Sequence, residues 1–177
     1  MTDHAMNTLL RTDGIALVTG CAEPLDLAET IIRRRTQNGQ GSSLALVDDA
    51  PLPPDQTLAD TALEAGHLAA IVDVDRHPGR LKEALVAAGA GLSAFLLTTQ
   101  PESGALVERI AAETASPEQE IYRQYFVNRV RLLSAPHSDG SRRITVLDAQ
   151  RRFDLDRQNP AVWSQWFSRL PTSDIVV

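Results

Sequence analysis

An apolar run that ends in a glycine is the part of this sequence best suited to chemistry. Residues 14–20 read Gly-Ile-Ala-Leu-Val-Thr-Gly, which predicts a buried strand with Gly20 at its carboxyl end. A glycine there lets the backbone approach phosphate groups, but further glycines are needed to complete a phosphate cradle. Residues 21–26 read Cys-Ala-Glu-Pro-Leu-Asp, with no second glycine, a proline that lacks an N–H, and two carboxylates. We therefore expect the phosphate chemistry to be lost or reassigned.

Two acidic residues follow other apolar runs and are the next candidates for binding. Asp48 ends one such run and Asp73 ends another. An acid in the position of Asp48 can accept hydrogen bonds from ribose hydroxyls, and it is equally an ordinary turn residue. Because the carboxyl ends of parallel strands meet at one edge of a sheet, we expect Gly20, Asp48, Asp73 and Thr98 to lie near one crevice. We take Gly20, Asp48 and Asp73 as candidate cofactor-binding residues and interpret them as vestigial.

Other reactive side chains form no catalytic or metal-binding pattern. Cys21 lies near the start of a predicted helix, which favours a thiolate, but Glu23 and Asp26 oppose that effect. The four histidines are scattered, at positions 4, 67, 77 and 137. None of them pairs at helical spacing with a second ligand, so we expect no metal site. We assign no catalytic residue.

Composition indicates one globular domain with an acidic balance. The chain has 177 residues, 43% of them hydrophobic, and a formal net charge of -6. A general nucleic-acid binder needs a basic face, so we expect no nucleic-acid partner. The single cysteine excludes an intrachain disulfide, and no segment has the length and apolarity of a membrane span. These features predict a cytoplasmic protein without a membrane partner.

Alternating segments predict the elements that position these residues. The expected strands are 15–19, 43–47, 67–72, 92–97 and 143–147, and the expected helices are 25–36, 55–64, 78–88, 102–114 and 117–133. This alternation predicts an α/β fold, with three Rossmann-like layers around a mainly parallel sheet of about five strands. We expect a polar N-terminal tail over residues 1–13, a single domain over 14–170 and a C-terminal tail over 171–177.

Six motifs in this order resemble the short-chain dehydrogenase/reductase family, from about Gly14 to Phe167. The matching segments are 17–20, 46–48, 73–75 and 92–97 for the first four strands, 117–128 for the long helix, and 140–146 for the fifth strand with its turn. The resemblance implies a Rossmann-like fold. It also implies that the acid after the second strand holds the adenosine ribose and that the acid after the third contacts the adenine.

The residues that perform that family's chemistry are missing. Its proton transfer needs a tyrosine with a lysine four residues later. Lys82 is the only lysine of the chain, and Tyr122 and Tyr125 are followed at that spacing by Phe126 and Arg129. We therefore expect a degenerate, truncated member of the family without catalysis and without a cofactor. NAD or NADP would be the ligand if cofactor binding were retained.

A second resemblance is to the deviant P-loop ATPases that partition chromosomes or position division sites. Residues 96–102, Leu-Leu-Thr-Thr-Gln-Pro-Glu, carry it together with the earlier segment 71–73. That class requires a lysine and a Ser/Thr after the glycine of its first loop, for the phosphates and for magnesium. Neither follows Gly20, so this resemblance also implies an inactive protein.

Aromatic side chains in the carboxyl-terminal third indicate association with other chains. The apolar stripe of the predicted helix 117–133 is broader than packing on a sheet requires, and the matching helix of short-chain dehydrogenases pairs with its twin. The candidate interface residues are Tyr122, Tyr125, Phe126, Arg129, Trp163, Trp166 and Phe167. The same faces also suit simple packing on the sheet, so both interpretations stay open.

The function that these features predict is that of a non-catalytic subunit. It would form a homo-oligomer, or a heteromer that supports an active short-chain dehydrogenase. The alternative is a small-molecule or nucleotide-binding protein, or an enzyme, that uses the crevice near Gly20.

Overall fold

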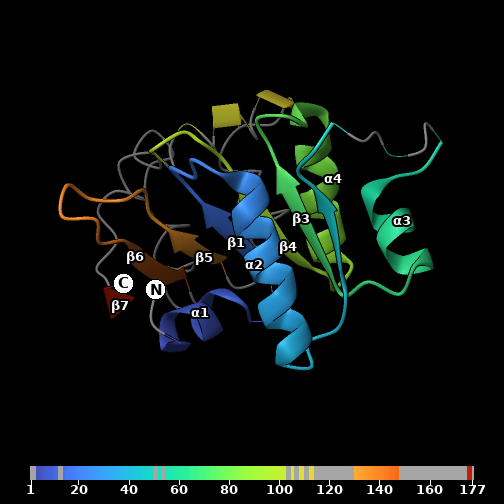
Figure 1. Cartoon of the computed structure of the whole chain (residues 1–177). Helices are drawn as coiled ribbons and strands as arrows, with labels where there is room; N and C mark the ends of the chain where they lie inside the picture. Colours follow the sequence, from blue (N-terminus) through green and yellow to red (C-terminus); the bar gives the residue numbers. More distant parts are fainter. Residues whose placement is uncertain are drawn as a thin grey trace.

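The computed structural model describes residues 3–11, 14–49, 52, 55–102, 105, 108–109, 112–113, 130–147 and 175–176. Its helices are α1 (Asp3–Leu9), α2 (Pro24–Gln37), α3 (Leu58–Glu64) and α4 (Leu81–Gly89), with a short 3-10 helix η1 (Pro78–Arg80) before α4. Its strands are β1 (Ile15–Val18), β2 (Ser43–Leu46), β3 (Ala69–Asp73), β4 (Ser93–Leu97), β5 (Val130–Leu133), β6 (Arg143–Leu147) and β7 (Ile175–Val176) (Figure 1). The described residues between 105 and 113 are also helical.

The strands form a sheet in the order β2-β3-β4-β1-β5-β6-β7. β1 lies at its centre, parallel to both β4 and β5, and β3 and β2 continue the parallel arrangement on one side. β6 and β7 extend the other side as antiparallel strands. β1 to β5 are therefore all parallel, which confirms the predicted α/β fold with a mainly parallel sheet.

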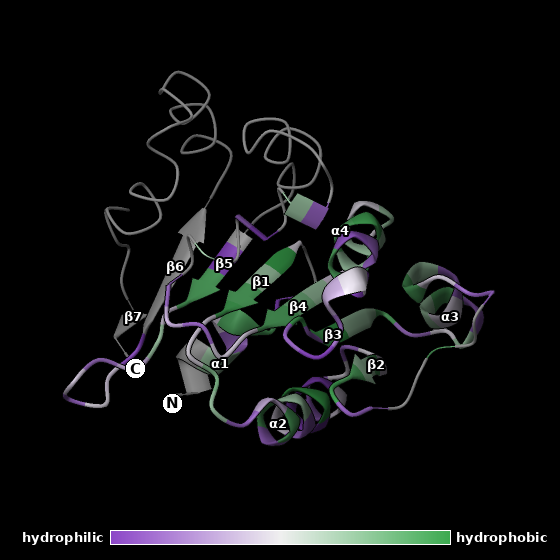
Figure 2. Ribbon diagram, turned by 90° about the horizontal axis from the view of Figure 1, so that it is seen from above, coloured by the Kyte–Doolittle hydropathy of each residue, from purple (hydrophilic) through white to green (hydrophobic). Residues whose placement is uncertain are grey.

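Helices cover both faces of the sheet and make three layers (Figure 2). Successive residues of a strand point to opposite faces, and β1 divides its side chains in this way. Ile15 and Leu17 pack in the cluster that includes residues of α3 and α4, whereas Ala16 and Val18 pack in the cluster that includes residues of α1 and α2. All four side chains are fully buried. An uninterrupted apolar strand such as β1 therefore suits the centre of a sheet that is covered on both sides.

All five predicted strands are present, but one predicted helix is wrong at its carboxyl end. The predicted helix 117–133 includes residues 130–133, which form strand β5. A short apolar run suits a buried strand and a buried helix equally, and its periodicity does not separate the two. Pairing with the central strand decides the outcome here, because Val130 lies in register with Ile15 and Leu133 with Val18.

The amino-terminal segment was expected to be a polar tail over residues 1–13, and this prediction is wrong where the segment is described. It contains helix α1, and Leu9 and Leu10 at its end are fully buried against the sheet. The buried Arg35 of α2 also donates a hydrogen bond to the carbonyl of Leu10 (3.4 Å). The helix was missed because its few apolar residues are diluted by polar ones over a single short stretch.

The order of the strands differs from that of a dinucleotide-binding fold. In the standard order, 3-2-1-4-5-6, the first strand lies between the second and the fourth. Here β1 lies between β4 and β5, and β4 separates it from β3. The layers expected from the dehydrogenase resemblance are present, but the connections between the strands are different.

Candidate functional site

The carboxyl ends of the parallel strands form the edge at which ligands bind in open α/β sheets. Three segments that the sequence singled out meet at this edge. They are the loop Thr19-Gly20-Cys21 after β1, the turn after Asp73 in β3, and Thr98-Thr99 after β4. Because β4 is the direct neighbour of both β1 and β3, its two threonines lie between the other two segments.

The loop after β1 uses its backbone donors within the protein. The N–H of Gly20 donates to the carbonyl of Gln100 (2.7 Å), and the N–H of Cys21 donates to the carbonyl of Thr98 (2.8 Å). The N–H of Thr19 donates to the carbonyl of Leu133 at the end of β5 (3.0 Å). In a phosphate-binding loop such N–H groups point at the ligand. Here they tie the end of β1 to its two neighbouring strands.

The space beside Gly20 is also filled. Gly20 has a left-handed backbone (φ +60), and a Cβ added to it would lie 2.6 Å from the Cβ of Ala135 and 3.2 Å from the Cδ of Pro136. A glycine is therefore required both by its backbone conformation and by the close approach of residues 135–136. This second reason has nothing to do with a ligand.

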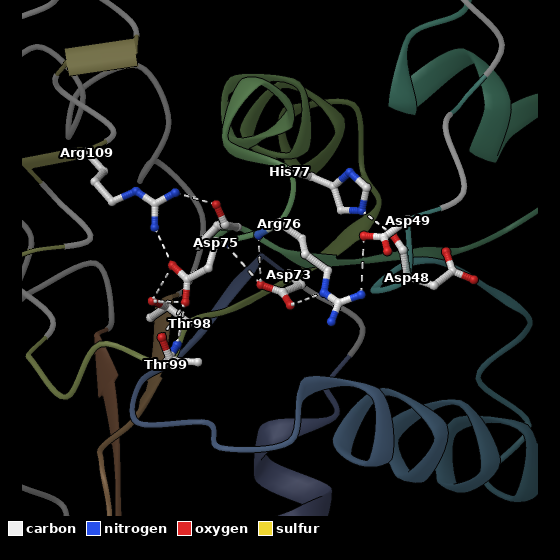
Figure 3. Close-up of polar contacts among 10 residues, drawn as sticks. Asp48, Asp49, Asp73, Asp75, Arg76, His77, Thr98, Thr99 and Arg109 are labelled. Carbon is white, nitrogen blue, oxygen red and sulfur yellow. Dashed lines mark hydrogen bonds and ion pairs between the residues drawn. The ribbon is translucent and has the colours of Figure 1, made fainter.

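Asp75 lies at the centre of a dense polar cluster (Figure 3). Its carboxylate accepts hydrogen bonds from the backbone N–H and the hydroxyl of Thr99 (both 2.7 Å) and from the hydroxyl of Thr98 (3.0 Å). It also pairs with the guanidinium of Arg109 (2.5 Å), which donates a second hydrogen bond to the carbonyl of Val74. The cluster thus joins the end of β3, the end of β4 and the helical residues around 109.

These contacts determine the charge of Asp75. Burial raises its pKa, but the hydrogen bonds from Thr99, Arg109 and Thr98 outweigh burial and hold the pKa below the ordinary value of 3.8. The group is therefore an ionised acceptor whose oxygens are already engaged. It is poorly suited to act as a general base.

The structure places Asp73 at the end of β3, where its side chain holds the turn that follows. Its Oδ1 accepts hydrogen bonds from the N–H groups of Asp75 (3.0 Å) and Arg76 (3.3 Å), and its Oδ2 lies 3.8 Å from Nε of Arg76. An aspartate that accepts from the backbone two residues ahead forms an ordinary Asx turn. The side chain is buried and fixes the path of the chain after β3.

Asp48 is not brought to Gly20. It follows β2, and β3 and β4 lie between β2 and β1. At about 4.8 Å for each strand spacing, β2 and β1 are roughly 14 Å apart. The side chain of Asp48 is exposed. The backbone carbonyl of Asp48 accepts a hydrogen bond from Nε2 of His77 (2.6 Å). Next to it, the exposed Asp49 pairs with Arg76 (3.4 Å) (Figure 3). The predicted trio of Gly20, Asp48 and Asp73 therefore does not converge on one point.

Arg142 and Cys21 complete this edge. Arg142 donates to the carbonyl of Thr19 (2.5 Å) and to that of Ser134 (2.7 Å), and burial lowers its pKa although the nearby Cys21 opposes this. Burial raises the pKa of the Cys21 thiol, while the charge of Arg142 partly lowers it. A buried thiol with a raised pKa is a poor nucleophile.

Sequence reasoning missed three of the residues that organise this edge, namely Thr99, Arg109 and Arg142. The pair Thr98-Thr99 after a buried strand was a usable signal, since adjacent hydroxyls at a strand end suit a carboxylate. Arg109 and Arg142 carried no such signal, because each arrives from an element whose position depends on the whole fold.

The predicted interface residues cannot be placed in this way. Tyr122, Tyr125, Phe126, Arg129, Trp163, Trp166 and Phe167 all lie outside the described residues. Within the described ranges, no group of three or more His, Cys, Asp or Glu side chains could hold a metal ion. In the same part of the chain, no helix has both the length and the apolarity needed to cross a bilayer.

Comparison with known proteins identifies the fold but no family. No protein-family model matches the chain, and no curated protein matches it either. Among solved structures, it is similar to the ATPase DotB of Legionella pneumophila (TM-score 0.61, 16% identity) and to DotB of Yersinia pseudotuberculosis (TM-score 0.61, 15% identity).

The extent of this match defines what it supports. It covers 96% of this chain but only 56% and 53% of the two DotB chains, so this chain spans about half of their length. At this identity the likeness concerns the fold alone. Both structures are of ATPases, which agrees with the resemblance to P-loop ATPases and not with that to the dehydrogenases.

Proposed function

We propose that this chain is a non-catalytic subunit that has the fold of an ATPase and acts by binding other protein chains. The observation that carries the proposal is the closed loop after β1. The N–H groups of Gly20 and Cys21, which would have to hold a phosphate, donate instead to Gln100 and Thr98. A phosphate could bind there only after these hydrogen bonds were broken.

The chemistry of the neighbouring side chains supports the same conclusion. A P-loop needs a lysine for the phosphates and a Ser/Thr hydroxyl for magnesium directly after its glycine. This chain has Cys21 and Ala22 in those places. The carboxylates of Asp73 and Asp75 accept hydrogen bonds from donors of the protein itself, and these donors compete with a hydrated magnesium ion.

Association with another protein chain is the role that we propose for a domain with this closed loop. The partner is a second copy of the chain or an active relative of the same fold. Because the structural likeness is to ATPases, an ATPase replaces the dehydrogenase that the sequence first suggested as the active partner. The aromatic residues of segments 117–133 and 160–170 are the expected contact residues.

The absence of nucleotide binding is the first testable consequence. We expect no saturable binding of MgATP, MgADP, NAD or NADP in isothermal titration calorimetry, and no hydrolysis of ATP above the buffer rate. An active ATPase assayed in parallel is the positive control, because it shows that the assays detect nucleotide binding and hydrolysis. A melting temperature that climbs steadily with nucleotide concentration would contradict the proposal, because a ligand stabilises the folded state it binds.

Association is tested separately by light scattering after size-exclusion chromatography. We expect a mass of at least two chains of 19.3 kDa, or a stable complex with a co-expressed ATPase of the same fold. Replacing Tyr125 with glutamate should split the assembly, and replacing the exposed Leu25 with glutamate should leave it intact. A chain that stays monomeric at high concentration and does not bind the ATPase would refute association.

A further inference from the structure

The turn between α2 and β2 contains the pair Asn38-Gly39, which is the only Asn-Gly pair of the chain. The turn follows the lower end of α2 in Figure 1. Asn38 is the residue at which α2 ends, and both residues of the pair are exposed. Gly39 has a left-handed backbone (φ +67), and no atom lies within 4 Å of the position that an added Cβ would take. No side chain therefore shields the backbone nitrogen of Gly39.

An asparagine that precedes a glycine is chemically labile in water. The backbone nitrogen of the glycine loses its proton to solvent and attacks Cγ of the asparagine, and a new C–N bond forms. The bond from Cγ to the side-chain nitrogen then breaks, and that nitrogen takes up a proton and leaves as ammonia. Water opens the resulting five-membered imide at either carbonyl, which gives aspartate or isoaspartate. A Cβ on the second residue hinders the attack, and glycine has none.

The hydrogen bonds at the end of α2 slow this attack but do not bury the reacting atoms. The N–H of Gly39 donates to the carbonyl of Thr36 (3.1 Å). The backbone of Asn38 (φ -85, ψ 3) has to rotate before that nitrogen reaches Cγ, so this hydrogen bond opens first. It lies in the last turn of an exposed helix end, and helix ends open at a lower free energy than the core.

We propose that Asn38 is a site of spontaneous deamidation in the folded protein, with water as the only co-reactant. The product changes the contacts at this end of the molecule. Nδ2 of Asn38 donates to Oδ1 of Asn7 (3.2 Å), which links α2 to α1, and a carboxylate has no proton to donate there. Isoaspartate also lengthens the backbone before Gln40, whose carbonyl accepts from the buried guanidinium of Arg35 (2.8 Å). We therefore expect the isoaspartate form to melt at a lower temperature.

The test is peptide mapping by mass spectrometry after the full chain is incubated at mildly alkaline pH, below its unfolding transition. Trypsin cleaves after arginine and lysine, so Asn38 falls in the peptide 36–76, where it is the only asparagine. Asn7 falls in the peptide 1–11 and is the internal control, because it shares the same hydrogen bond but precedes Thr8 within α1. We expect the aspartate and isoaspartate forms of 36–76 to accumulate, while 1–11 stays unchanged.

Two variants separate reaction in the folded protein from reaction after unfolding. Gly39→Ala keeps Asn38 but places a Cβ beside the attacking nitrogen, so it should deamidate several times more slowly. Asp75→Ala loses hydrogen bonds far from the end of α2, so it should react at the wild-type rate although the whole fold is less stable.

Two results would overturn the proposal. One is a rate in Asp75→Ala that rises in step with its loss of stability, because the reaction would then need global unfolding. The other is a folded wild type whose peptide 36–76 stays unchanged when a urea-unfolded sample has reacted. Both readouts concern one chain, so they are independent of whether the protein binds nucleotides or partners.

Discussion

Replacing Asp75 with alanine is expected to lower the free energy of unfolding by about 3 kcal/mol, because it leaves the Arg109 guanidinium and the Thr99 N–H without their acceptor. The substitution disconnects three parts of this edge at once, because the carboxylate links the end of β3, the end of β4 and the helical residues near 109. Urea unfolding followed by circular dichroism measures it.

Two substitutions make this prediction specific. Asp49→Ala removes a carboxylate that also pairs with an arginine, but its side chain is 92% exposed, so we expect a change below about 0.5 kcal/mol. Asp75→Asn keeps the shape and one acceptor oxygen while it removes the charge, and its effect should lie between those of the other two. Equal stabilities of Asp75→Ala and Asp49→Ala would refute the structural role of the cluster.

The pH dependence of stability gives an independent measurement of the same contact. The pKa of Asp75 is lowered in the folded state, so its stabilisation is fully present above the ordinary value of 3.8 and is lost as the pH falls through the folded-state pKa. Asp75→Asn should therefore lose stability relative to the wild type near neutral pH. The difference should shrink as the wild type is acidified below the ordinary carboxyl range.

Replacing Gly20 with alanine is expected to destabilise the fold by about 3 kcal/mol, from a left-handed backbone cost of about 1–2 kcal/mol and an overpacking cost of about 1–3 kcal/mol. The new Cβ would meet the Cβ of Ala135 at 2.6 Å and its Cα at 2.9 Å. Neither atom belongs to a flexible side-chain end, so the turn has to shift. Thermal and urea unfolding report the change.

Gly39→Ala is the control for this substitution. Gly39 has a similar left-handed backbone (φ +67), but nothing lies within 4 Å of the position of its added Cβ. We expect it to show the backbone cost alone, about 1–2 kcal/mol. Ala135→Gly combined with Gly20→Ala should recover part of the difference, because the clash between the two Cβ atoms disappears. Equal losses of stability in Gly20→Ala and Gly39→Ala would mean that Ala135 does not clash with a Cβ at position 20.

The sequence predicted the strands well where apolar residues are uninterrupted. Ile15–Val18 and Ser93–Leu97 are buried on both faces, and a continuous apolar run is the direct signature of that environment. The same property made residues 130–133 ambiguous, because a buried helix can carry such a run as well. Only the pairing of β5 with β1 shows that these residues form a strand, and the local pattern of apolar residues does not predict which strands pair.

The arrangement of the candidate site was less predictable than its strands. Pro24 and the missing glycines after Gly20 can be read from the sequence, but the hydrogen bonds from the N–H groups of Gly20 and Cys21 to the carbonyls of Gln100 and Thr98 cannot. The proximity of Asp75 to Thr98 depends on β4 lying between β1 and β3, and that order follows from how the helices cross the sheet. The same order separates Asp48 from Gly20, which sequence reasoning had grouped together.

The central position of β1 has a consequence for how the chain is made. Ile15 pairs with Ala94 on one side and with Val130 on the other, so the ribosome releases β1 long before either neighbour exists. Until then its apolar edges are open, and open edges are where chains aggregate. A chain that stops before residue 130 would not be a smaller version of this domain, because its innermost strand would still lack one neighbour.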